Sequence, residues 1–255
     1  MIVTPHFVYV HLHKSGGTFI NEALVRHVPE AVVVGYHLPV SSIPQDALGL
    51  PVLGFVRNPW SYYVSWFSFQ RGLPQQNHLF RCVSQDNSLG FKDSIRRLLG
   101  LESDPALLSQ VLQGLPEVYV NRGLNLPRQA LEPIRGSGLG FYSHLYRHMY
   151  GSGAGRALHI GCTESLRQDL AAFFGKIRYL PPEAMSHHIE VGLARNRSVH
   201  GDYRLYYDDE LRRLVEQRDG ELIRAYGYSF EQALPAPVVP APASALDAAA
   251  ETRLA

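Results

Sequence analysis

Two short segments of the chain carry side chains that together could hold phosphate groups. The first follows an apolar run at residues 7–12 and precedes apolar residues at helical spacing, which is the order strand, glycine turn, helix. Its glycines allow successive N–H groups to converge on an anion at the positive end of the helix, and its lysine adds a full charge. We therefore expect a phosphate-binding loop. Its residues are His13, Lys14, Ser15, Gly16, Gly17, Thr18 and Phe19.

The order of residues in this loop separates it from the common nucleotide triphosphate loop. That loop reads GxxxxGK[ST], with the lysine after the glycines and a hydroxyl that helps to hold magnesium. Here Lys14 precedes Gly16 and Gly17, so the pattern is not matched. The alternative is a glycine turn capped by Ser15 or Thr18, with a solvated lysine. A second segment of the chain is needed to distinguish this turn from a phosphate-binding loop.

The second segment surrounds Arg57. An apolar strand at residues 52–56 leads into Arg57, and Pro59 suits the first turn of a helix at residues 60–69. Ser65 lies two helical turns beyond Arg57, so a guanidinium fork and a hydroxyl could approach one phosphate. An arginine at a strand end is, on its own, more often solvated or paired with an acid.

Together the two segments resemble the sulfotransferase superfamily, in motif style the bacterial and carbohydrate or Golgi-type members. The family's 5′-phosphosulfate loop corresponds to the KSGGT of residues 14–18, and its 3′-phosphate motif corresponds to Arg57 and Ser65. The likeness continues at residues 159–166 with Asp169, and at residues 206–230. It does not extend to residues 71–155.

The resemblance implies a donor, 3′-phosphoadenosine 5′-phosphosulfate (PAPS), a product, adenosine 3′,5′-bisphosphate (PAP), and no metal. It also implies Arg197 and Ser198 as further cofactor contacts, because residues 196–204 stand where relatives have a loop that closes over the nucleotide. A basic surface loop is an equally good interpretation of this stretch.

Sulfuryl transfer to a hydroxyl needs a cation, oriented N–H groups and a base. Lys14 and the loop amides would supply the first two. His37 follows an expected strand at residues 31–34, resembles the strand-end histidine of glycan and uronyl sulfotransferases, and is predicted to be the general base of an in-line transfer. A histidine that only packs there is the alternative, and Glu22 is the reserve base.

The remaining aromatic and histidine side chains have weaker assignments. His11 and His13 alternate on one face of the first strand and are candidates to orient the donor; the alternative, and the commoner case, is a histidine that packs within the strand. The aromatic run at residues 60–69 should be mostly core, with Trp60 a candidate for the adenine. Two histidine pairs are assigned to surface or acceptor-site roles, since no metal motif frames them: His144 with His148, and His187 with His188.

The alternation of strands and helices predicts an α/β fold, a three-layer, P-loop-like arrangement with a central, mainly parallel sheet flanked by helices. We expect one domain over residues 1–234, with a helical acceptor-site insertion at about 71–155. Residues 208–226 read as one amphipathic helix. Residues 235–255 are rich in proline and alanine and are expected to be a disordered tail.

Composition limits the partners. With 24 basic and 23 acidic residues the formal charge is +1, so no global field favours nucleic acid or an anionic membrane. Two cysteines give no disulfide framework, and neither a signal peptide nor a spanning segment is evident, which favours a cytoplasmic, bacterial protein. We expect a small-molecule, lipid or saccharide acceptor; the oligomeric state stays open.

Two other functions remain open from the sequence. One is an ATP-dependent small-molecule kinase on the same α/β scaffold, which would require magnesium and ignore a 3′-phosphate. The other is a catalytically inactive nucleotide-binding protein, because a fold alone does not settle activity.

Overall fold

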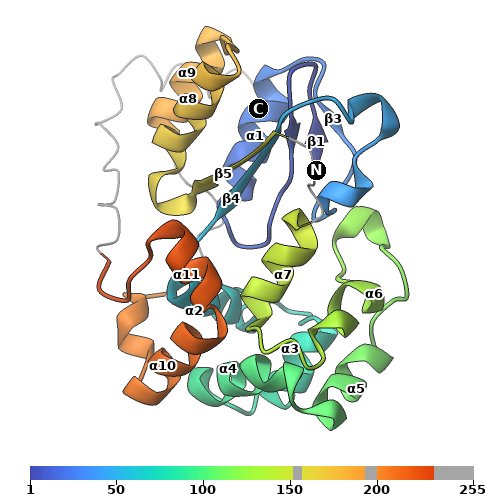
Figure 1. The fold of residues 1–255 in the computed structure, drawn as a ribbon, viewed down its shortest axis with the longest axis vertical. Coiled ribbons are helices and arrows are strands. Elements are labelled where there is room, and N and C mark those ends of the chain that lie inside the picture. The colour runs from blue at the N-terminus through green and yellow to red at the C-terminus, as the bar shows by residue number, and fades with distance from the viewer. Residues whose placement is uncertain (152–156, 193–199, 233–255) are drawn as a thin grey trace, which may run out of the picture.

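A five-stranded sheet organises the part of the chain that the computed structural model describes, residues 1–151, 157–192 and 200–232. The strand order is β3-β1-β2-β4-β5 (Figure 1). β2, β4 and β5 run parallel to one another, while β1 is antiparallel to both of its neighbours. The strands are β1 (Ile2–Val3), β2 (Val8–Tyr9), β3 (Val32–Val33), β4 (Val52–Val56) and β5 (Leu158–Cys162).

The two faces of the sheet belong to two separate apolar clusters. Side chains alternate across a strand, so Val52 and Val56 of β4 enter one cluster, and Leu53 and Phe55 enter the other. Three helices cover the face of Leu53 and Phe55. They are α1 (Gly17–His27), α8 (Leu166–Lys176) and α9 (Glu183–Val191).

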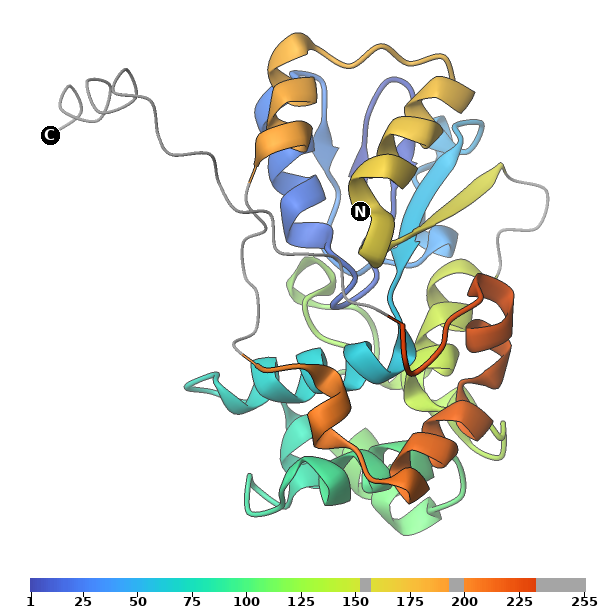
Figure 2. The ribbon, with the colours of Figure 1, turned by 90° about the vertical axis from the view of Figure 1, so that its left-hand side faces the viewer.

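A helical half lies below the carboxyl ends of the parallel strands (Figure 2). β4 passes directly into α2, and α7 reaches back to the sheet, where the Tyr150 hydroxyl donates to the Val10 carbonyl at 3.1 Å. The helices of this half are α2 (Pro59–Arg71), α3 (His78–Ser84), α4 (Phe91–Leu99), α5 (Pro105–Gln113), α6 (Arg128–Leu131), α7 (Phe141–Tyr150), α10 (Asp209–Arg218) and α11 (Gly220–Tyr226).

The single helix expected over residues 208–226 is wrong, because the chain breaks at Asp219 into α10 and α11. Asp219 is fully buried and accepts hydrogen bonds from the Tyr63 hydroxyl at 2.7 Å and the Ser143 N–H at 2.8 Å. These partners from α2 and α7 hold the carboxylate inside the helical half, and this fixes the position of the break between α10 and α11.

Some expectations fall beyond what is described. Arg197, Ser198 and the expected tail at 235–255 lie outside the described residues. Within the described ranges, every helix is too short or too polar to cross a membrane.

Candidate active site

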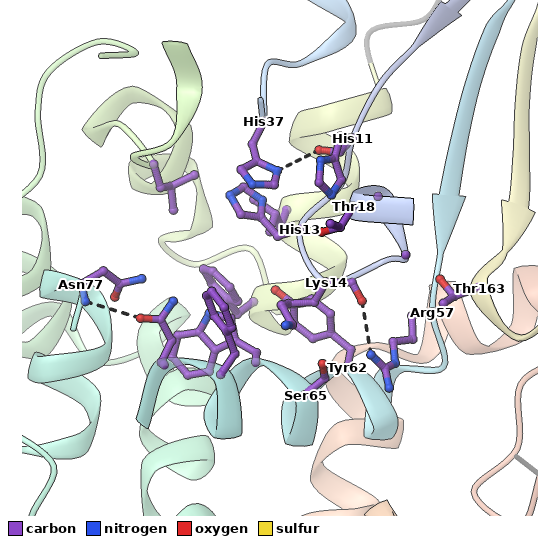
Figure 3. A pocket seen from close by; sticks show the side chains of 18 of the residues that line it. His11, His13, Lys14, Thr18, His37, Arg57, Tyr62, Ser65, Asn77 and Thr163 are labelled. Carbon is purple, nitrogen blue, oxygen red and sulfur yellow. Dashed lines mark hydrogen bonds between the residues drawn. The ribbon is translucent and has the colours of Figure 1, made fainter. Parts of the chain in front are cut away.

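The two predicted phosphate-binding segments meet at one cavity of about 1720 Å³ at the carboxyl ends of the parallel strands (Figure 3). The cavity is lined by residues of the loop before α1, by the end of β4, by α2 and by the residues after β5. The predicted residues that line it are His11, His13, Lys14, Gly16, Gly17, Thr18, Phe19, His37, Arg57 and Ser65.

The loop has the backbone of an anion site. Lys14 and Gly16 have φ angles of 58° and 78°, in the left-handed region, and α1 begins at Gly17. The first N–H groups of a helix have no partner within it, so they face outward toward any anion. No acidic side chain occupies the first turn of α1 to compete for them.

Gly17 is required by close packing rather than by its conformation. A Cβ at this position would lie 1.9 Å from the ring of His11. The histidine ring therefore lies directly against the start of α1, and it brings the first strand and the loop together. A larger residue at 17 would have to displace either the ring or the helix.

The Lys14 ammonium lies 4.1 Å from the centre of the Phe69 ring, and both residues line the cavity. Burial, reinforced by the neighbouring Arg57 guanidinium, lowers the pKa of Lys14 to about 8. An anion bound beside Lys14 would restore the preference for the charged form.

Arg57 lies against α2 as the sequence predicted. Its Nε donates to the Ser61 hydroxyl at 3.0 Å, and its guanidinium also contacts the Lys14 carbonyl at 3.4 Å. Ser61 and Ser65 are buried and line the cavity one helical turn apart. Ser61 was not predicted, although the spacing of four from Arg57 to Ser61 and again to Ser65 was the signal for it.

A buried tyrosine that sequence reasoning missed joins the two segments. The Tyr142 hydroxyl accepts from the Arg57 backbone N–H at 2.7 Å and lies 3.2 Å from the Ser15 hydroxyl. Its ring stacks on Tyr62 with centroids 3.7 Å apart. The Ser15 side chain is thereby turned away from the cavity, so only its main chain is left to meet a ligand.

His37 is held in one tautomer. Its Nδ1 lies 3.0 Å from the His11 carbonyl, which can only accept, so Nδ1 carries the proton and Nε2 is left as the basic nitrogen. Burial lowers the pKa of His37 to about 4, against the opposing effect of this hydrogen bond. His37 is therefore neutral at pH 7.

Three histidine rings gather at this end of the cavity. The His37 ring stacks on the His13 ring, with centroids 3.6 Å apart, and its centroid lies 4.5 Å from that of the His11 ring. Burial lowers the pKa values of His11 and His13 as well, and the Nδ1 atoms of both are buried without a hydrogen-bond partner. All three histidines named from the sequence therefore line one end of the cavity, with His11 and His13 packed beside the proposed base.

Other candidates lie elsewhere. Glu22 pairs with Arg26 at 3.7 Å and does not line the cavity. Trp60 is 2% exposed and donates to the Arg212 carbonyl, so a contact with adenine is not supported. A surface role for His144 is wrong, because it is buried with Nε2 at 2.8 Å from the Ala130 carbonyl.

Residues from the two later segments, 159–166 and 206–230, form hydrogen bonds at the start of α2 beside this site. The Glu164 carboxylate accepts from the Asn58 N–H at 2.8 Å and from the Tyr228 hydroxyl at 3.2 Å. Asn58 in turn caps α2 by accepting from the Trp60 and Ser61 N–H groups. Glu164 thus connects the segment that follows α11 to the start of α2. In the described residues, no group of three or more His, Cys, Asp or Glu is placed to hold a metal ion.

Comparison with known proteins finds a likeness in fold among solved structures. No family model matches the chain, and no curated protein matches it. Among solved structures, mouse sulfotransferase SULT7A1 complexed with PAP is similar, with a TM-score of 0.49 and 12% identity, covering 86% of this chain and 84% of that chain. A likeness at this level carries no inference about binding or chemistry.

Proposed function

We propose that the chain is a PAPS-dependent sulfotransferase that transfers a sulfuryl group to an acceptor hydroxyl. The observation that carries the proposal is the meeting of two cations from different strand ends, Lys14 and Arg57, in one cavity with a histidine held in the tautomer of a base. The motif resemblance to the superfamily supports the same donor. We also propose the three-layer, P-loop-like description of the fold and the single domain over residues 1–234.

The residues present fit a doubly phosphorylated nucleotide. The N–H groups at the start of α1, together with the main chain of Ser15 and the side chain of Thr18, would hold the 5′-phosphosulfate beside Lys14. Arg57, Ser61 and Ser65 would hold the 3′-phosphate. Bound PAPS would supply an activated sulfuryl group whose bond to the phosphate oxygen breaks as a bond to the acceptor oxygen forms.

His37 takes the proton of the acceptor hydroxyl in this proposal. Its Nε2 is the free basic nitrogen because the His11 carbonyl holds Nδ1–H. The imidazolium that results lies against the His13 ring, 3.6 Å away, in a stacked arrangement that an aromatic neighbour can stabilise. Lys14 stabilises the charge that develops on the departing phosphate oxygen.

A transfer assay with labelled PAPS tests the proposal against its alternatives. The protein is incubated with PAPS, or with ATP and magnesium, and a mixed panel of hydroxylated acceptors. We expect labelled product and PAP from PAPS alone. Product from ATP would establish the kinase instead, and tight PAP binding with no transfer to any acceptor would establish the inactive nucleotide-binding protein. Bacterial source, cytoplasmic location and contacts from Arg197 and Ser198 remain predictions.

A further inference from the structure

The cavity extends well beyond the residues assigned to the donor. Its second part, here called the acceptor half, is the part lined by residues within 66–79, 114–126 and 141–145, and it is continuous with the part that holds Lys14, Arg57 and His37. None of the described residues that line the acceptor half is Asp, Glu, Lys or Arg. The polarity of this half indicates which acceptors it can hold.

The floor of the acceptor half is apolar. Trp66, Leu79, Phe141 and Leu145 line it, and each is buried. The cation that reaches this half, Lys14 at 4.1 Å from the centre of the Phe69 ring, is assigned to the donor. A carboxylate, sulfate or phosphate placed on the apolar floor would therefore lose its hydration without a counter-ion of its own, which is unfavourable. The acceptor half therefore disfavours charged acceptors.

Most of its polar side chains are carboxamides, and His78 adds an imidazole. Gln75 and Gln76 lie on the connection between α2 and α3, and Asn121 and Asn125 lie on the loop before α6. A carboxamide both donates and accepts, so it matches a hydroxyl group whichever way the hydroxyl points. Gln75, Asn121 and Asn125 are exposed, which places the amides at the rim and the apolar side chains at the floor.

The loop that carries Asn121 and Asn125 lies against the proposed base. The Tyr36 N–H donates to the Arg122 carbonyl at 2.7 Å, and the His37 N–H donates to the Gly123 carbonyl at 3.3 Å. Two of the rim amides therefore come from the loop that is bonded to the His37 segment. A hydroxylated group positioned for His37 would meet these amides first.

Two apolar side chains in the cavity are exposed to an unusual degree. Leu124 is 54% exposed and Phe69 is 37% exposed, although both line the cavity. Exposed apolar surface in a concave site is the usual mark of a site that a ligand covers. The acceptor therefore needs an apolar part as well as hydroxyl groups.

We propose that the acceptor is an uncharged amphiphile that presents a polyhydroxylated head to His37 and lays an apolar tail along the floor formed by α2, α3 and α7. The chemistry is that of an alkyl glycoside. This inference rests on the proposed sulfotransferase function and names the substrate class of the same site.

Four matched acceptors test the inference, each below its micelle concentration and with saturating labelled PAPS. They are octyl β-glucoside, methyl β-glucoside without the tail, octyl β-glucuronide with a charged head, and 1-octanol without the head. We expect kcat/KM for octyl β-glucoside to exceed that for methyl β-glucoside at least 100-fold, and that for the other two at least 10-fold. Equal or better use of any of the three overturns the inference.

Failure of the inference and failure of the proposed function give different results. PAP binding is measured by calorimetry in parallel, and 2-naphthol serves as a phenolic acceptor outside the proposed class. If PAP binds and 2-naphthol alone is sulfated, the acceptor class is wrong and the proposed function stands. If PAP binds and none of the five acceptors is sulfated, the acceptor class is again wrong, and the mixed acceptor panel of the transfer assay then decides between a sulfotransferase and an inactive nucleotide-binding protein. If PAP does not bind, the proposed function fails and the inference fails with it.

A matched pair of variants gives a second readout on the protein itself. Leu124 and Val118 are both 54% exposed on the segment between α5 and α6, and only Leu124 lines the cavity. We expect Leu124→Ser to raise KM for octyl β-glucoside about 5- to 10-fold without changing KM for methyl β-glucoside or the affinity for PAP, and Val118→Ser to change none of them. Equal effects of the two substitutions would contradict a tail contact at Leu124.

Discussion

The two ends of the cavity are built in different ways. The charged end is the part that holds Lys14, Arg57 and His37, and its side chains come from the ends of strands and the first turns of helices. Hydrogen bonds through Tyr142 connect the loop to Arg57. The acceptor half is assembled from three separate stretches by packing, with amides, apolar side chains and the His78 imidazole, and with no Asp, Glu, Lys or Arg among its described lining residues. Changes at the charged end should therefore affect every reaction of the protein, whereas changes in the acceptor half should affect the acceptor alone.

The largest effects are expected from Lys14→Ala and His37→Ala. Loss of a general base or of an oriented charge typically lowers kcat by roughly 10²- to 10⁴-fold. His37→Ala should leave PAP affinity intact, while Lys14→Ala should weaken it as well; radiolabel transfer and calorimetry give the two readouts. His187→Ala, at an exposed position, is the control. Unchanged PAPS-dependent turnover in both variants would refute the assignment of the charged end.

Gly17→Ala tests whether the loop depends on close packing. The new Cβ would overlap the His11 ring, so we expect a loss of about 1–3 kcal/mol in the free energy of unfolding and at least 10-fold weaker PAP binding. Gly90→Ala is the control, because a Cβ there meets no atom within 4 Å. Urea titration and calorimetry measure the two quantities. Equal behaviour of the two variants would mean that the His11 contact does not shape the loop.

Tyr142→Phe tests the connection between the two segments. The substitution leaves the Arg57 N–H and the Ser15 hydroxyl without their shared partner, which in general costs about 1–3 kcal/mol. We expect PAP affinity to fall roughly 10-fold. Tyr146→Phe, on the same helix, also removes a hydrogen bond, the one to the Tyr226 hydroxyl. It should lower stability without changing PAP affinity, and an equal loss of affinity would show that Tyr142 has no special role.

The smallest effects are expected from a change of pH. His37 must be neutral to accept a proton, so kcat/KM should fall as the pH drops through its pKa of about 4. Lys14 must be charged, so PAP affinity should weaken as the pH rises through its pKa of about 8. The profile should be flat between these limits. An acid limb near 6.5, the ordinary value for histidine, would contradict the burial of the base.

The sequence predicted the charged end well because its signals are local. The strand at 52–56 is confirmed as β4, and the helix expected at 60–69 is confirmed within α2. Lys14, Arg57, Ser65 and His37 do line one cavity. Each of these follows from a glycine turn, a strand end or a helical spacing within about ten residues.

What the sequence could not predict depends on partners far along the chain. The Tyr142 hydroxyl bonds residues 85 and 127 positions away, and no local pattern marks it. The break at Asp219 is decided by Tyr63 and Ser143, since an amphipathic pattern continues through it. The acceptor half matches no sequence motif, because its amides and apolar side chains form one surface only when the three stretches are folded together.

The most direct test of the central claim measures whether one nucleotide bridges the loop and Arg57. Calorimetry compares PAP with adenosine 5′-monophosphate, which lacks the 3′-phosphate, on the wild type and on Arg57→Ala, with Arg71→Ala as an exposed control on α2. We expect the wild type and Arg71→Ala to prefer PAP at least 100-fold, and Arg57→Ala to bind the two ligands almost equally. A wild type that binds both ligands equally, or an Arg57→Ala variant that keeps the full preference, would contradict the bridging of the loop and Arg57 by one nucleotide.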